Sequence, residues 1–266
     1  MRRTETFFKT IRKAQGVLAV FFTVCFFGAP VNALADEGKV EGVFEKLNLD
    51  IAVSGTMDFY SQYVWRGFAL DTDPVFQPGF SMSGYGFTFT FWSSWDGSNN
   101  DAINGDEIDY VFDYTKEFEL VKVSLGHTYY DFPGTGSFSK EFYSAFSLTK
   151  LPLTPTITFY HDYGNHRQGG GHGQYVTLKL SQSITLIQNP DIVLNLSVVN
   201  GYNRHLFIRG NGGNTLLSAG VTVPLTANLS MTPSVNYSLT YGDLKDEDDG
   251  NQKNRFYAGV SFAYAF

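Results

Sequence analysis

The sequence predicts an all-β fold, a transmembrane antiparallel up-and-down β-barrel of about 12 strands with both termini on the periplasmic side. Apolar and small polar residues alternate over segments of ~10 residues or more, close to the ~9–11 residues that a membrane strand needs. The polar faces of these segments are mostly Ser, Thr, Asn and Gly, which suit a wet interior. The connections alternate between short and long, as periplasmic turns and extracellular loops do.

The N-terminal 35 residues predict a signal peptide. Basic residues precede the apolar stretch 16–28, and Ala33-Leu34-Ala35 supplies an A-x-A cleavage site. The only cysteine, Cys25, lies inside this segment, so the mature chain has neither disulfides nor thiol chemistry. Residues 36–48 then form either a short amphipathic helix or a frayed leader.

The barrel itself is expected over residues 49–266. The predicted strands are 49–66, 75–83, 86–96, 107–116, 119–131, 140–149, 154–163, 174–183, 191–202, 214–224, 227–241 and 254–266. Pro233 removes one ladder hydrogen bond from the eleventh strand and raises the possibility of a bulge there.

Charged residues on the inward phase of these strands predict a constriction that orients or filters small solutes or ions. Bracing salt bridges across the wall are the alternative use of the same charges. The fourth strand is the clearest case, because three carboxylates alternate with apolar residues along it. The candidate lumen residues are Asp58, Arg66, Glu107, Asp109, Asp113, Lys122, Glu141, Lys179 and Arg255.

The stretch YVWRGF (Tyr63 to Phe68) places an arginine among aromatic residues at the end of the first predicted strand. Neighbours in a strand point to opposite faces. We therefore expect Trp65 to face lipid and Arg66 to point into the lumen, where Glu107 or Asp109 pairs with it. Gly67 then lets the chain turn into the first loop.

Aromatic residues near the strand ends predict an interfacial girdle, and the final aromatic residue resembles the C-terminal signal read by the outer-membrane assembly machinery. These residues are Trp65, Trp95, Tyr241, Phe262, Tyr264 and Phe266.

Other functional classes find less support. The net charge of −7 and the lack of a basic patch argue against nucleic-acid binding. No motif indicates a cofactor or a metal site, since the acidic run 246–250 lacks the full ligand spacing of a calcium loop. His127 and His161 fall on the lipid-facing phase, which disfavours a hydrolase.

Residues 54–115 resemble the TorF family of proteobacterial outer-membrane porins. The resemblance rests on SQYVWRG (61–67), on Asp73, Pro74, Gln77 and Gly79, on Trp92 and Ser94, and on Glu107 and Asp109. Gln62 stands where the family commonly has Asp, and FALDT follows Arg66-Gly67 instead of the usual Ile-Ser-Gln-Thr. The resemblance implies a barrel and a channel without a known substrate.

The sequence thus predicts a channel in the outer membrane of a Gram-negative bacterium, through which small solutes or ions diffuse. The expected partners are membrane lipid, lipopolysaccharide and the barrel assembly machinery. A closed barrel that binds at the surface or braces the membrane is the second hypothesis, and an outer-membrane hydrolase is the third. An inward-folded loop that plugs the lumen would favour the second.

Overall fold

The computed structural model describes residues 50–97, 106–250 and 252–266. The predicted signal peptide and the predicted segment 36–48 lie outside these residues. The chain divides into two compact units, Ala52–Ala265 and a second unit of Met1–Ile51 with Phe266. The unit Ala52–Ala265 contains every strand described below.

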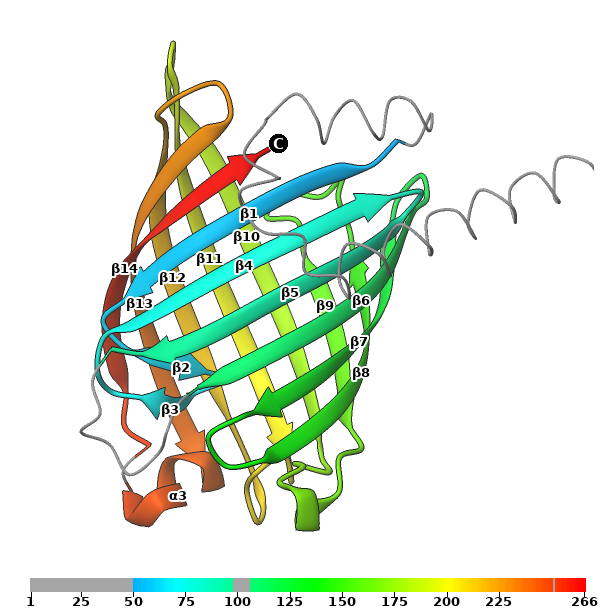
Figure 1. The fold of residues 1–266 in the computed structure, drawn as a ribbon, viewed down its shortest axis with the longest axis vertical. Helices are drawn as coiled ribbons and strands as arrows, with labels where there is room; N and C mark the ends of the chain where they lie inside the picture. Colours follow the sequence, from blue (N-terminus) through cyan, green and yellow to red (C-terminus); the bar gives the residue numbers. More distant parts are fainter. Residues whose placement is uncertain (1–49, 98–105, 251) are drawn as a thin grey trace, which may run out of the picture. The chain divides into compact units, whose positions relative to one another are not determined.

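This unit is a closed antiparallel barrel in the order β1-β14-β13-β12-β11-β10-β9-β8-β7-β6-β5-β4 (Figure 1), so the predicted fold is confirmed. Each strand pairs with its neighbour in the sequence, and β1 pairs with β14 to close the sheet. The bounds of the barrel strands are β1 (Ala52–Tyr60), β4 (Val75–Gly84), β5 (Phe87–Asp96), β6 (Glu107–Glu117), β7 (Lys122–Phe132), β8 (Ser137–Ser147), β9 (Thr156–Asp162), β10 (Gln174–Gln188), β11 (Asp191–Arg204), β12 (Asn211–Pro224), β13 (Leu229–Gly242) and β14 (Arg255–Ala265).

The two ends of the barrel differ. One end, here called the loop end, carries the connection 61–74, the β9–β10 loop with the 3-10 helix η2 (His166–Gln168), and the helix α3 (Asp243–Gly250). The other end, the turn end, carries shorter connections such as 85–86 and 225–228 (Figure 1). Most connections at the loop end are longer than those at the turn end, but the pattern fails once: residues 133–136 at the loop end are a short turn, and residues 148–155 at the turn end are longer. The acidic run 246–250 lies within α3.

Exposed apolar side chains mark the outer face of the wall. Phe87, Phe112 and Phe142 are each more than half exposed, whereas inward neighbours such as Glu141 and Thr128 are buried. A barrel in water would hide its apolar face, so this distribution is the one expected of a wall surrounded by lipid.

The bulge considered at Pro233 is absent. Pro233 causes no bulge, because the register between β13 and β14 is continuous from Leu229 to Ser238. The irregularity lies instead in the β10–β11 pair, between Thr185 and Ile187. The predicted inward and outward phases on β13 therefore hold on both sides of Pro233.

The first predicted strand, 49–66, is also too long. β1 ends at Tyr60, and β2 (Tyr63–Trp65) and β3 (Phe68–Asp71) form a separate two-stranded sheet between β1 and β4. This hairpin sets the geometry of the site. Among the described residues, no helix is long and apolar enough to cross a membrane.

Candidate functional site

The β2–β3 hairpin lies inside the barrel. Its Tyr63 ring packs 5.6 Å from Trp92 on β5. A Cβ atom added at Gly67, in its turn, would lie 2.8 Å from Asn214 Cβ on β12 and 3.2 Å from Thr240 on β13. Since these contacts reach inward side chains of both walls, the hairpin crosses the lumen.

A two-residue turn brings Arg66 to the tip of this hairpin. Trp65 pairs with Phe68, and the residues between them have positive φ, 50° at Arg66 and 90° at Gly67. Two central residues with positive φ are the requirement of a type I′ hairpin turn. Glycine adopts this conformation freely, but arginine does so at some cost.

Arg66 forms a bidentate ion pair with Glu141 on β8. Its Nη1 and Nη2 each lie 2.7 Å from one carboxylate oxygen of Glu141 on β8. The Tyr130 hydroxyl donates a third hydrogen bond to Glu141, at 3.0 Å from Oε1. Glu141 is completely buried, so this pair is held without competition from solvent at the carboxylate.

Three aromatic rings surround the same guanidinium. Arg66 Cζ lies 4.4 Å from the ring centroid of Trp65, 4.2 Å from Tyr160 and 4.7 Å from Tyr175. All three distances are within the range of favourable cation–π contacts. Tyr175 is fixed in turn because its hydroxyl donates to Asn214 Oδ1 at 2.7 Å.

The tyrosines belong to a ladder on the inner wall. Tyr143, Tyr160 and Tyr175 are cross-strand partners on β8, β9 and β10. Neighbouring ring centroids are 5.8 Å and 5.9 Å apart. Antiparallel register aligns inward side chains in such rows, so one tyrosine in each strand suffices to build the ladder.

Further carboxylates line the constriction on β6, which pairs with β7 beside the ion pair. Tyr63 donates to Glu107 Oε2 at 2.9 Å, and Tyr143 donates to Asp113 Oδ2 at 2.7 Å. Asp109 stands between them on β6, and its Oδ1 is buried without a hydrogen-bond partner. The carboxylates of Glu107, Asp109, Asp113 and Glu141 thus line the constriction near the guanidinium of Arg66.

The remaining predicted lumen residues lie on the inward phase but apart from this cluster. Asp58 accepts a hydrogen bond from the Ser261 hydroxyl. Lys122 and Lys179 follow the inward phase of Ser124 and Thr177 and are exposed. Arg255 shares its phase with Tyr257, whose ring packs against Tyr60.

Two expectations for YVWRGF need correction. Trp65 does not belong to an outer girdle, because its ring packs 6.0 Å from Tyr130 and 5.9 Å from Phe207 inside the loop end. Arg66 pairs with Glu141 and not with Glu107 or Asp109. The cause is the turn at Arg66-Gly67, which reverses the chain into the lumen where a continuous strand was expected.

The other predicted girdle residues lie on the outward phase. Trp95 and Tyr241 are 44% and 39% exposed, so each is accessible from outside the wall. Phe262 pairs in register with outward Met57, and Tyr264 pairs with Leu229. Phe266 is exposed. Their roles in the membrane and in assembly stay predictions.

Tyr130, Tyr160 and Tyr175 were not predicted as site residues. Tyr130 and Tyr175 stand on the inward phase of the sequence among small residues, which was the available signal. Gly67 was the signal for the hairpin turn, since two short β-like runs, 63–65 and 68–71, flank it.

A small apolar core covers the hairpin at the loop end. Phe68, Ile208 and Leu244 are buried together, and Trp65 and Leu70 pack against them. Ala69 N–H also donates to Gln252 Oε1 at 2.9 Å. The hairpin is therefore held both by its tip and by the loops above it.

The next candidates are a metal site and the two histidines considered for a hydrolase. No group of His, Cys, Asp and Glu among the described residues is arranged to hold a metal ion. His127 lies on the outer face, where it forms a hydrogen bond of 2.8 Å with the Tyr163 hydroxyl. His161 is exposed on the same phase.

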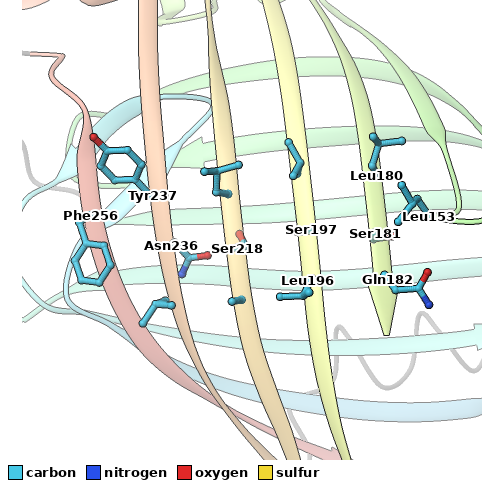
Figure 2. A pocket seen from close by; sticks show the side chains of 14 residues that line it. Leu153, Leu180, Ser181, Gln182, Leu196, Ser197, Ser218, Asn236, Tyr237 and Phe256 are labelled. Atoms are coloured by element: carbon cyan, nitrogen blue, oxygen red, sulfur yellow. The ribbon is translucent and has the colours of Figure 1, made fainter. Parts of the chain in front are cut away.

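A shallow apolar groove runs over β10 to β14 (Figure 2). The outward side chains that line it include Leu180, Leu196, Val235, Tyr237 and Phe256. Ser181, Ser197 and Asn236 on the inward phase stand behind it, so the groove and the constriction belong to opposite faces of the wall.

Comparisons with known proteins support the fold. No protein-family model matches the chain, and no curated protein matches it either. Among solved structures, the NanC porin is similar at a TM-score of 0.51 and 8% identity, over 80% of this chain and 99% of that chain. The KdgM porin is similar at a TM-score of 0.52 and 10% identity, over 81% of this chain and 99% of that chain. A structure of KdgM in complex with disordered oligogalacturonate gives a TM-score of 0.53 at 9% identity. At such identities the likeness establishes a porin-like barrel fold.

Proposed function

We propose that this protein is an outer-membrane channel for the passive diffusion of small solutes or ions, with the β2–β3 hairpin as its constriction. The observation that supports this function best is a hairpin that crosses a closed barrel and places the Arg66–Glu141 ion pair beside three further carboxylates. Small polar residues such as Ser81, Thr90 and Ser124 line the rest of the inner wall and suit a water-filled path.

The charge of the constriction favours cations. Glu141 neutralises Arg66. Glu107 accepts from Tyr63, and Asp113 accepts from Tyr143 and Thr115, so these hydrogen bonds bring no cation to either carboxylate. Asp109 Oδ1 is buried without a hydrogen-bond partner. One solved structure holds KdgM in complex with disordered oligogalacturonate. The net negative constriction of this chain repels such an acidic solute, so cations are the expected solutes.

Planar-bilayer recording of the purified, folded chain tests this function. We expect discrete conductance steps in KCl. A barrel that is folded by heat-modifiability on gels but gives no steps at any applied voltage contradicts the channel.

The inward-folded hairpin and the apolar core above it favour a second function, that of a closed barrel that binds at the cell surface or braces the membrane. Leu206 and Leu244 are fully buried in this region, and Asp243 Oδ2 accepts from Asn211 N–H at 2.7 Å, which joins α3 to β12. The same recordings separate the two functions, since a barrel closed by the hairpin gives no conductance steps with the hairpin in place and conducts only after residues 62–72 are removed.

Location, partners and family complete the proposal. A cleaved signal peptide at residues 1–35, insertion by the barrel assembly machinery through β14 and Phe266, and contacts with lipid and lipopolysaccharide all follow from an outer-membrane barrel. Membership of the TorF family rests on the motifs in residues 54–115. Fractionation of a Gram-negative host, with N-terminal sequencing of the outer-membrane form, tests the location and the cleavage.

A further inference from the structure

The side chains around the Arg66 guanidinium form a site that the barrel wall holds by itself. We call Tyr130, Glu141, Tyr160 and Tyr175 the wall cage. They come from β7, β8, β9 and β10, four consecutive strands of the barrel, and the cross-strand register fixes their spacing. Only Trp65, the fifth neighbour of the guanidinium, belongs to the hairpin.

The wall cage matches a planar cation in three respects. The two oxygens of Glu141 accept two parallel N–H donors at 2.7 Å each. The faces of Tyr160 and Tyr175 lie 4.2 Å and 4.7 Å from the central carbon. Glu141 is buried and Tyr130 orients it, so the carboxylate presents these acceptors in a fixed direction. A guanidinium satisfies all three requirements, whereas a neutral urea of the same shape offers the planarity and the N–H donors but no positive charge for the carboxylate and the ring faces.

The group that fills the cage now belongs to a strained turn. Arg66 has a φ of 50°, which is unfavourable for a residue with a side chain, and its hairpin is a sheet of two short strands with a register shift between Tyr63 and Val64. Residues 61–74 connect β1 and β4, which pair directly from Tyr60 and Val75 onward. The barrel wall that carries the cage therefore closes without the hairpin.

We propose that the wall cage is a binding site for solutes that carry a guanidinium group, and that Arg66 occupies it as a built-in competitor. A free guanidinium compound that takes the place of Arg66 releases the hairpin tip from the far wall. The site deepens the proposed function by naming a solute class. Its use in transport rests on the channel function, but its existence does not.

A second aromatic ring with a carboxylate beside it lies next to the wall cage, toward the turn end. Tyr143 lies beside Tyr160 in the ladder, two residues from Glu141 toward the turn end, and its hydroxyl contacts Asp113. A cation that leaves the cage toward the turn end meets a second aromatic face with a carboxylate beside it.

Chemical rescue tests the binding site. Titration calorimetry on the detergent-folded full chain compares Arg66→Ala with the double variant R66A/E141Q, using ethylguanidinium as ligand and ethylurea as its neutral counterpart. We expect saturable, millimolar binding of ethylguanidinium to R66A, at least about tenfold weaker binding to R66A/E141Q, and no binding of ethylurea.

A second variant guards against misfolding of R66A. Replacement of residues 62–72 by Gly-Ser-Gly removes the competitor and leaves all four wall-cage residues and every barrel strand. This variant is expected to bind ethylguanidinium, with lower affinity than R66A because Trp65 is lost. Failure of both folded variants to bind, or equal binding of ethylguanidinium and ethylurea, overturns the proposal.

Conductance separates this inference from the channel function. Ethylguanidinium binding without conductance steps keeps the site and rejects the channel. Conductance steps without ethylguanidinium binding keep the channel and reject the site.

Discussion

Glu141 is the residue on which the constriction depends most. It accepts two hydrogen bonds from Arg66 and one from Tyr130, and it is fully buried. Removing one partner of a buried ion pair leaves the other charge without compensation, which costs about 3–5 kcal/mol in comparable cases.

Glu141→Gln is therefore expected to lower the free energy of unfolding by about 3 kcal/mol, measured by urea titration of the barrel in lipid vesicles. Asp58→Asn is the matched control, because Asp58 is inward but only partly buried and accepts its hydrogen bond from the neutral Ser261 hydroxyl. If both variants lose the same free energy of unfolding, the ion pair does not stabilise the barrel.

Gly67 tests how closely the hairpin tip packs against β12 and α3. A Cβ there would lie 2.8 Å from both Asn214 Cβ and Leu244 Cδ2. Gly136 also has positive φ, but no atom lies within 4 Å of its Cβ position. Alanine at either position strains the backbone, but only alanine at position 67 also meets close neighbours. The difference between the two variants therefore measures the packing effect.

Gly67→Ala should destabilise the barrel by about 1–3 kcal/mol more than Gly136→Ala in the same urea titration. Equal losses in the two variants would mean that the hairpin tip is not packed against β12 and α3.

The hairpin is the element that narrows the barrel. It contacts inward or loop-end side chains from β5 to β13, whereas the wall closes without it through the β1–β4 and β1–β14 pairs. Its removal changes the cross-section of the lumen and leaves the strand number unchanged.

Replacement of residues 62–72 by Gly-Ser-Gly is expected to raise the single-channel conductance several-fold while the heat-modifiable gel shift of the folded barrel persists. An unchanged conductance in the folded variant would place the narrowest part of the path elsewhere. A matched replacement of loop residues 133–136, whose hydrogen bonds go to Phe132 and Ser137 at the ends of β7 and β8, serves as control.

At the scale of the whole molecule, the distribution of charge predicts ion selectivity. The constriction carries four carboxylates and one guanidinium, and fixed charges in a narrow, low-dielectric passage act strongly on passing ions. We expect a reversal potential in a KCl gradient that indicates a preference for K⁺ over Cl⁻.

The triple variant Glu107→Gln, Asp109→Asn, Asp113→Asn should reduce this preference markedly. Lys179→Gln, a change on the inward wall outside the cluster, should not reduce it. An anion preference of the unmodified channel would contradict the charge argument.

The strands were predictable because their signal is local. Alternation along 229–242 or 255–265 depends only on which neighbours face lipid and which face the interior. The position of the hairpin inside the barrel was not predictable. Arg66 and Glu141 are 75 residues apart in the sequence, and nothing near Arg66 identifies its partner. Trp65 shows most clearly why local sequence was insufficient, since an aromatic ring suits both a lipid interface and the interior of a barrel that is narrowed by a hairpin.

The position of the hairpin within the chain also bears on the order in which the barrel forms. β1, the hairpin and β4 are contiguous, so they can pair early, whereas the β1–β14 contact between Asp58 and Ser261 joins residues 203 apart. Glu141, Tyr160 and Tyr175 lie on β8, β9 and β10, so they reach Arg66 only in a curled sheet. The Arg66–Glu141 pair therefore stabilises the curled sheet relative to an open one.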